Sequence, residues 1–245
     1  MPLKITFNYS PNFNIKKRSK NQIHFIVIHY TGMKNESAAV KRLTEIQYEV
    51  RTHYLIKNNG DLINMVPELY IAWHAGKSSW KNYEALNSKS IGIELVNPGH
   101  QYGYRNFPKK QINTLVKLLK NLKRRYNINP TNILGHSDIS PNRKKDPGEK
   151  FPWQLLAKKR LAIWHNLKRN KIKRYRKTKV KNTNQYLFLK NLSKIGYNGK
   201  NLKKNSKDKI LVVKAFQRRF RQELVNGKID KECFIIGQNL IKKAN

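Results

Sequence analysis

Residues 23–29 form the run IHFIVIH, which predicts a buried β-strand. The run is apolar and rich in β-branched residues, and the polar pair Thr31-Gly32 follows it closely, as is typical where a strand ends. His29 is the last residue of the run. The predicted strand therefore carries an imidazole at its end.

Strand-like and helix-like segments alternate through the first 166 residues. Further strands are expected at 52–56, 62–66, 90–96 and 132–136, and helices at 37–50, 109–126 and 154–166. Leucines recur at helical spacing in 109–126, whereas 90–96 alternates and places Gly92 and Glu94 on one face. Interleaved strands and helices predict an α/β layer arrangement.

The C-terminal third has a different pattern. Residues 168–181 hold nine Lys or Arg and no core-forming pattern, which predicts a linker or an exposed basic segment. In 183–245, apolar residues recur at helical spacing and are interrupted twice by glycine-containing breaks, which predicts three short helices. We therefore divide the chain into 1–166, a basic linker at 167–182 and a small three-helix domain at 183–245.

The composition is that of a globular protein with a strongly basic surface. The 245 residues are 38% hydrophobic, enough for one sizeable core and a small second unit. The formal net charge is +38, from 52 Lys and Arg against 14 Asp and Glu. Such a surface favours polyanions, including nucleic acid, anionic membrane and acidic cell-wall polymer. Abundant Lys, Asn and Ile also match a genome poor in G and C, so the charge alone identifies no partner.

Few features of the sequence bear on its compartment. Cys233 is the single cysteine, so an intrachain disulfide is excluded. The N-terminal residues MPLKITFNYSPNF lack the basic stretch, apolar core and cleavage site of a secretory signal, and no run approaches the ~18 apolar residues of a membrane span. We expect neither a signal peptide nor a transmembrane segment.

Three widely separated side chains indicate a metal site. His29 and His136 each end a predicted strand, and Asp146 follows ten residues after His136. Two imidazoles and a carboxylate are ligands that zinc accepts, and a catalytic zinc site keeps a further position for water. The alternative is a hydrogen-bonded core histidine at position 29 and an Asp146 that caps the turn Asp-Pro-Gly.

Other polar residues suit a hydrolase with such a centre. Glu94 interrupts an apolar strand and would serve as a general base, unless it simply faces solvent. Lys144 precedes Asp146 by two residues and would stabilise an oxyanion, unless it is one surface lysine among many. Trp73 and His74 lie in a loop rich in Gly and Ser, where they would line a cleft or pack the loop.

Several blocks of the sequence resemble one enzyme family. The blocks VIHYTG, THYLI, LINMVPE, AWHAGKSSW, SIGIELVNPG and ILGHSDISPNRKKDPGEKFPW occur in collinear order over 22–165. They resemble the zinc-dependent N-acetylmuramoyl-L-alanine amidases of the type-2 amidase family, in its AmiD/AmpD branch, which is related to the peptidoglycan recognition proteins. The runs KNLSKIGYNG and VVKAFQRRFRQELVNGKID resemble the three-helix peptidoglycan-binding domain that follows the catalytic domain in AmiD-type enzymes. The segment 99–108 and the basic linker match no block that we can place.

The resemblance implies a fold and a set of site residues. The fold is a mixed central β-sheet flanked by helices, and one zinc ion per chain is held by His29, His136 and Asp146. Glu94 is implied as the catalytic acid and base, and Lys144 as the partner that stabilises the transition state. The implied substrate-binding residues are Trp73, His74 and Asn97.

The implied reaction is hydrolysis of the amide between the lactyl group of N-acetylmuramic acid, or its 1,6-anhydro form, and L-alanine of the stem peptide. The implied partners are peptidoglycan and anhydro-muropeptides, with nonspecific polyanion binding as a side property. AmiD-type proteins are often lipoproteins and the AmpD branch is cytosolic. Because no signal peptide or lipobox is visible, the choice between cell envelope and cytoplasm stays open.

Two other classes are disfavoured by the residues. A non-catalytic recognition protein of this fold typically lacks a metal ligand, whereas the ligand set, Glu94 and Lys144 are all present here. A nucleic-acid-binding protein would explain the charge, but zinc-finger cysteines and an RRM-like aromatic motif are missing.

Overall fold

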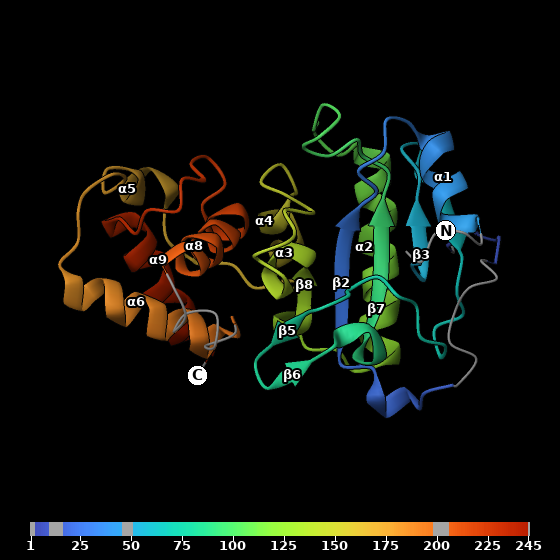
Figure 1. Cartoon of the computed structure of the whole chain (residues 1–245), viewed down its shortest axis with the longest axis horizontal. Coiled ribbons are helices and arrows are strands. Elements are labelled where there is room, and N and C mark those ends of the chain that lie inside the picture. The colour runs from blue at the N-terminus through green and yellow to red at the C-terminus, as the bar shows by residue number, and fades with distance from the viewer. Residues whose placement is uncertain (1–2, 10–16, 46–50, 198–205, 245) are drawn as a thin grey trace.

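The computed structural model describes residues 3–9, 17–45, 51–197 and 206–244. A sheet with helices on both faces forms the N-terminal part, and a group of helices lies beside the β8 edge of that sheet (Figure 1). None of the described helices is long and apolar enough to cross a membrane.

Six strands form the main sheet in the order β1-β4-β3-β7-β2-β8. They are β1 (Ile5–Phe7), β2 (Phe25–Tyr30), β3 (Tyr54–Ile56), β4 (Leu62–Asn64), β7 (Ser90–Leu95) and β8 (Ile133–Gly135). A separate two-stranded ribbon pairs β5 (Ser79–Trp80) with β6 (Tyr83–Glu84). Strand β2 is parallel to both its neighbours, whereas β3 and β4 are antiparallel. The predicted mixed central sheet is confirmed.

The helices follow the order of the chain around this sheet. They are α1 (Glu36–Thr44), α2 (Lys109–Arg125), α3 (His136–Ile139), α4 (Trp153–Lys158), α5 (Arg169–Lys173), α6 (Asn182–Ile195), α8 (Ser206–Phe220) and α9 (Lys231–Ala244). Short 3-10 helices occur at Lys20–Gln22, Leu86–Lys89 and Pro130–Asn132.

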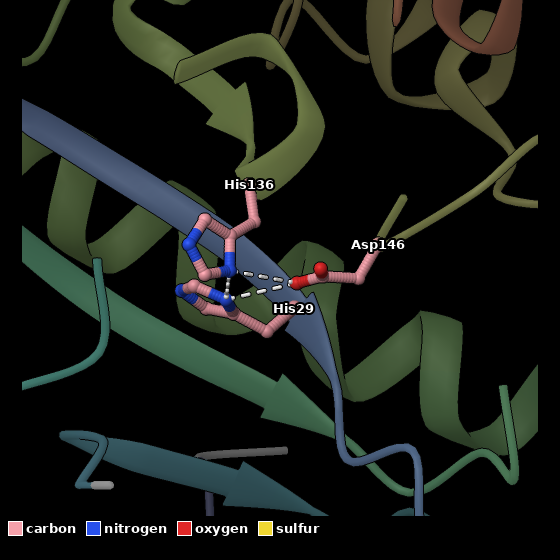
Figure 2. A group of neighbouring side chains, drawn as sticks. All are labelled: His29, His136 and Asp146. Atoms are coloured by element: carbon pink, nitrogen blue, oxygen red, sulfur yellow. Dashed lines mark hydrogen bonds and ion pairs between the residues drawn. The ribbon is translucent and has the colours of Figure 1, made fainter. Parts of the chain in front are cut away.

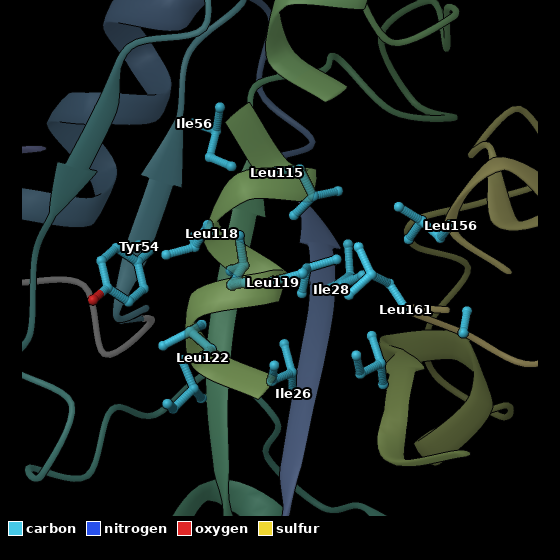
Figure 3. Packing of buried hydrophobic residues seen from close by; sticks show 14 of the residues in the cluster. Ile26, Ile28, Tyr54, Ile56, Leu115, Leu118, Leu119, Leu122, Leu156 and Leu161 are labelled. Atoms are coloured by element: carbon cyan, nitrogen blue, oxygen red, sulfur yellow. The ribbon is translucent and has the colours of Figure 1, made fainter. Parts of the chain in front are cut away.

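Helix α2 covers one face of the sheet (Figure 3). Its leucines at helical spacing, Leu115, Leu118, Leu119 and Leu122, are all buried. They pack in one cluster with Ile26 and Ile28 of β2 and with the isoleucines of β7. Burial of each leucine stabilises this packing by roughly 2 kcal/mol. Ile26 and Ile28 therefore face α2, and His29 points to the opposite face of the sheet.

The opposite face of the sheet shares its core with the C-terminal helices. Phe25 and Val27 of β2 belong to the same buried cluster as Phe188 of α6 and Phe216 of α8. The cluster also includes Trp80 of the small ribbon. The C-terminal helices therefore bury apolar surface against the sheet and against one another.

Two predicted helices end earlier than expected. Helix α4 stops at Lys158 because Arg160 adopts a left-handed backbone (φ 58°) and the N–H of Leu161 bonds to the carbonyl of Leu156. Helix α1 ends at Thr44, and residues 46–50 of the predicted helix lie outside the described residues. Part of the predicted basic linker forms α5, with Ile172 buried. The predicted domain boundaries stay a prediction.

Candidate metal centre

Three buried side chains from distant parts of the chain meet at one end of β2 (Figure 2). His29 lies near the end of β2, His136 is the first residue of α3 directly after β8, and Asp146 lies in the loop after α3. The two Nδ1 atoms are 2.9 Å apart, and Asp146 Oδ2 lies 3.0 Å from His29 Nδ1 and 3.1 Å from His136 Nδ1. The structure thus brings the predicted ligand set together.

A chain of hydrogen bonds places the proton of the neutral His29 ring on Nε2. Ser90 Oγ donates to the carbonyl of Leu86 at 2.6 Å, so it accepts from His74 Nε2 at 3.2 Å. His74 Nδ1 then carries no proton and accepts from His29 Nε2 at 3.0 Å. The Nδ1 atom of His29 is left with a lone pair directed toward Asp146.

His136 is held in the same tautomer. Its Nε2 donates to the carbonyl of Ala75 at 3.2 Å, which leaves a lone pair on Nδ1. Burial, and then the neighbouring His136, lower the pKa of His29 to about 4, so its imidazole is neutral near pH 7. Two imidazole nitrogens and a carboxylate oxygen therefore converge within 3.1 Å of one another. These three ligand atoms fit a metal ion.

Glu94 lies beside this centre because of the sheet register. In the parallel pairing of β2 and β7, His29 and Glu94 are direct partners, so their side chains leave the same face of the sheet. Glu94 is 7% exposed, and its Oε2 has no hydrogen-bond partner among the described residues. Burial and then the charge of Asp146 raise the pKa of Glu94 well above its ordinary value, while Lys144 opposes the rise. A buried carboxyl of this kind is suited to accept and return a proton.

The family model for N-acetylmuramoyl-L-alanine amidase (Amidase_2) matches residues 19–149, which include the three metal-ligand candidates and Glu94. The chain belongs to this amidase family. Escherichia coli strain K12 AmiD is 36% identical over 236 residues, covering 91% of this chain and 83% of AmiD. Haemophilus influenzae AmpD is 32% identical over 163 residues, covering 59% of this chain and 86% of AmpD.

Two solved structures share nearly all of this architecture. The E. coli AmiD complex with anhydro-N-acetylmuramic acid-L-Ala-D-gamma-Glu-L-Lys superposes with a TM-score of 0.79 at 34% identity, covering 91% of this chain and 90% of that one. Pseudomonas aeruginosa AmpDh3 in complex with anhydromuramic pentapeptide gives a TM-score of 0.79 at 30% identity, covering 99% of both chains. The likeness extends through the C-terminal helices.

A cleft of about 480 Å³ opens onto the centre of this amidase-family fold. Glu94 and Lys144 line it along with the three metal-ligand candidates. Its wall also carries several cationic side chains, namely Arg42, Arg143, Lys144 and Lys145. A cleft with this lining favours an anionic ligand.

The predicted substrate-binding residues occupy three different environments. His74 lines the cleft but is buried, with both ring nitrogens hydrogen-bonded. Trp73 is 42% exposed and does not belong to the described residues that line the cleft. Asn97 is buried and holds its own loop, since its Nδ2 donates to the Arg105 carbonyl and its Oδ1 accepts from the Gly99 N–H. Substrate contact by these residues stays a prediction.

Sequence reasoning missed two residues around the centre. Ser90 ends the hydrogen-bond chain from His29, and strand alternation could have placed it on the same face as Gly92 and Glu94. Arg143 bonds to the carbonyls of Ala75 and Lys77 at the cleft wall. No sequence signal distinguishes it among 52 basic residues.

Gly92→Ala is expected to disturb the centre without touching a ligand. A Cβ at this position would lie 2.4 Å from Cγ of His74, so the ring must move away from His29. We expect a loss of stability of about 1–3 kcal/mol from overpacking and weaker metal binding, measured by denaturant unfolding and chelator competition. Ile93→Val, on the other face of the same strand, is the control and should leave metal binding unchanged. Unchanged metal binding in Gly92→Ala would contradict a role for the His74 contact.

Proposed function

We propose that this amidase cleaves the bond between the lactyl group of N-acetylmuramic acid, intact or in the 1,6-anhydro form, and L-alanine of the stem peptide, using one bound zinc ion. The observation that carries the proposal is the convergence of three potential ligand atoms near the buried carboxyl of Glu94, whose Oε2 has no hydrogen-bond partner among the described residues. The likeness to AmiD and AmpD over most of the chain supports the choice of substrate bond.

Zinc suits the donor set of His29, His136 and Asp146. Tetrahedral zinc with bonds of about 2.0–2.2 Å to nitrogen and oxygen separates its ligand atoms by roughly 3.3 Å. The observed separations of 2.9 to 3.1 Å need only a slight expansion. When bound, zinc supplies Lewis acidity to the carbonyl under attack and lets water act as a nucleophile near neutral pH.

Glu94 takes the part of the proton carrier. Its carboxylate accepts a proton from the attacking water, and the resulting acid returns the proton to the nitrogen of L-alanine as the amide bond breaks. The raised pKa favours the second step because it makes the protonated carboxyl easier to form. The unpaired Oε2 leaves the carboxyl available to a ligand in the cleft.

Lys144 stabilises the negative charge that develops on the carbonyl oxygen. It is half-buried at the cleft wall, where a cation acts more strongly than in bulk water. Its charge also acts on Glu94, whose pKa it lowers against the larger effect of burial.

Lys144→Met should therefore have two measurable effects. Loss of the cation should reduce kcat by about 10²-fold or more, as removal of one oxyanion partner does. Because Lys144 favours the charged form of Glu94, its removal raises the pKa of Glu94. The acid limb of the kcat/KM profile should move to higher pH, since the base form then appears only at higher pH. A profile that stays in place or moves to lower pH would contradict this coupling.

Stem peptides carry free carboxylates, which fits the cationic cleft wall. Anhydro-muropeptides occupy the relatives solved as complexes, which supports the same ligand class here. We further propose that residues 183–245 form a unit that binds peptidoglycan.

The direct test is digestion of purified peptidoglycan and of a defined 1,6-anhydro-muropeptide, with products identified by mass spectrometry. Free peptides that begin with L-alanine would establish the bond, and comparison of the two rates would establish the preferred substrate. Retention of the L-alanine linkage in both substrates, with zinc bound, would exclude the proposed reaction.

A further inference from the structure

A buried carboxylate links the candidate metal centre to the C-terminal helices. Asp138 lies two residues after His136 in α3, and its side chain is 1% exposed. Its Oδ2 accepts from the N–H of Gly135 at 2.9 Å and from Arg219 Nη1 at 2.5 Å, and its Oδ1 accepts from the Tyr197 hydroxyl at 2.8 Å. Arg219 and Tyr197 both belong to the C-terminal part of the chain.

Arg219 contacts α3, which begins at His136, and the neighbouring segments β8 and α4. Besides Asp138 in α3, its Nη2 donates to the carbonyl of Ile133 in β8 at 3.1 Å, and its guanidinium lies 4.2 Å from the ring centre of Trp153 in α4. The side chain of Arg219 is 2% exposed. A planar, permanently charged group with several donors can hold these segments in one arrangement.

Further contacts fix the C-terminal helices against the sheet. The N–H of Lys81 donates to the carbonyl of Gly196 at 2.7 Å, and a Cβ at Gly196 would lie 2.3 Å from the Trp80 ring. Gln222 Nε2 donates to the carbonyl of Phe151 at 2.6 Å. With the shared core, these contacts place α8 against α3.

Movement of α3 would disturb two of the three metal-ligand candidates. His136 is the first residue of α3, and the Asp138 carboxylate bonds to the backbone just before it. The N–H of Ser137 donates to the carbonyl of Asp146 at 2.8 Å, so α3 also holds the loop that carries the carboxylate ligand. Unpairing of the buried Asp138 charge would strain this turn.

We propose that the C-terminal helices position the metal ligands through a cluster formed by Arg219, Tyr197 and Asp138. These residues act as positioning residues, since they touch neither substrate nor the metal-binding atoms. On this account the C-terminal part of the chain completes the hydrolytic centre, in addition to any role in holding the cell-wall polymer. The inference rests on the proposed function, because it presupposes that the centre binds zinc.

The test compares two variants of the full chain that lose buried arginines of the same segment. Arg219→Met removes the contact with α3. Arg221→Met is the matched control, because Arg221 pairs with Asp230 within the C-terminal part and, among the described residues, forms no hydrogen bond or ion pair with the sheet or α3. Zinc affinity is measured by competition with a chromophoric chelator, and turnover on a small soluble anhydro-muropeptide that needs no anchoring to a wall.

Arg219→Met is expected to bind zinc about tenfold more weakly or worse, in line with the effect of losing outer support of a ligand, while Arg221→Met binds like the wild type. Turnover of the soluble substrate should fall in Arg219→Met and stay at the wild-type level in Arg221→Met. Equal zinc affinity in Arg219→Met and wild type, or equal weakening in both variants, would overturn the inference. Tyr197→Phe gives a second test should Arg219→Met not fold, since it removes one bond to Asp138 and keeps the ring packed on Trp80.

For Tyr197→Phe a smaller weakening of zinc binding is expected, and wild-type affinity would count against the inference. The wild-type measurement separates the two proposals. Failure of the wild-type chain to bind zinc would reject the proposed function. Wild-type zinc affinity in both Arg219→Met and Tyr197→Phe would reject only the positioning role.

Discussion

Glu94→Gln lowers the rate of amide hydrolysis by roughly 10²- to 10⁴-fold, the usual contribution of a general acid–base group. Glutamine keeps the size and burial of the side chain but can neither accept the proton of the attacking water nor return it to the leaving amine. The pairing of Glu94 with His29 across β2 and β7 stays intact, so the metal ligands should keep their places. The measurement is kcat on an anhydro-muropeptide, together with the zinc content of the variant.

The control for Glu94→Gln is Glu84→Gln, which neutralises an exposed glutamate in β6. We expect wild-type kcat in the control and unchanged zinc content in both variants. A kcat for Glu94→Gln within a few-fold of the wild type, with zinc bound, would show that another group carries the proton.

Asp146→Ala removes the anionic ligand and should abolish both zinc binding and turnover. The two remaining donors are imidazoles, which bring no negative charge and hold a divalent cation far less well in a buried site. Zinc present at about 1,000 times its Kd stabilises a protein by about 4 kcal/mol through binding to the folded state alone. The variant should lose this zinc-dependent rise in Tm, measured by thermal unfolding with and without added zinc.

The apo forms provide the control for Asp146→Ala. Asp146 contacts His29 and His136 without metal as well, so the Tm of each zinc-treated chain is compared with that of its own apo form. A variant that still gains stability from zinc as the wild type does would show that Asp146 is not a ligand. If Asp146→Ala is unfolded without metal, the same comparison is made with Asp146→Asn, which keeps the side-chain size and removes the charge.

The sequence predicted the parts of the site that depend on local pattern. The apolar run before His29 and the alternation around Glu94 placed both residues on strands, because a side-chain period of two is visible in a single segment. The pairing of β2 with β7 joins residues far apart in the chain, so the pattern within one segment does not predict it. The grouping of His29 with His136 and Asp146 was suggested by ligand chemistry and supported by the family resemblance.

Contacts that support the site could not be predicted in the same way. Asp138 and Arg219 are 81 residues apart, and nothing in the sequence separates Arg219 from the other basic residues. The bond from His29 to His74 likewise depends on the space above Gly92, which appears only once the loop has packed on the sheet. The end of α4 at Lys158 depends on the left-handed backbone of Arg160. An arginine in the sequence does not predict that conformation, which non-glycine residues adopt only rarely.

The most direct test of the account is a zinc titration of the metal-free wild-type chain, followed by turnover of a 1,6-anhydro-muropeptide. The account predicts no turnover without metal, a linear rise as zinc is added and a plateau at one zinc per chain. It also predicts no rise for Asp146→Ala over the same range. Full turnover by the metal-free chain, or a plateau that Asp146→Ala reaches as readily as the wild type, would contradict it.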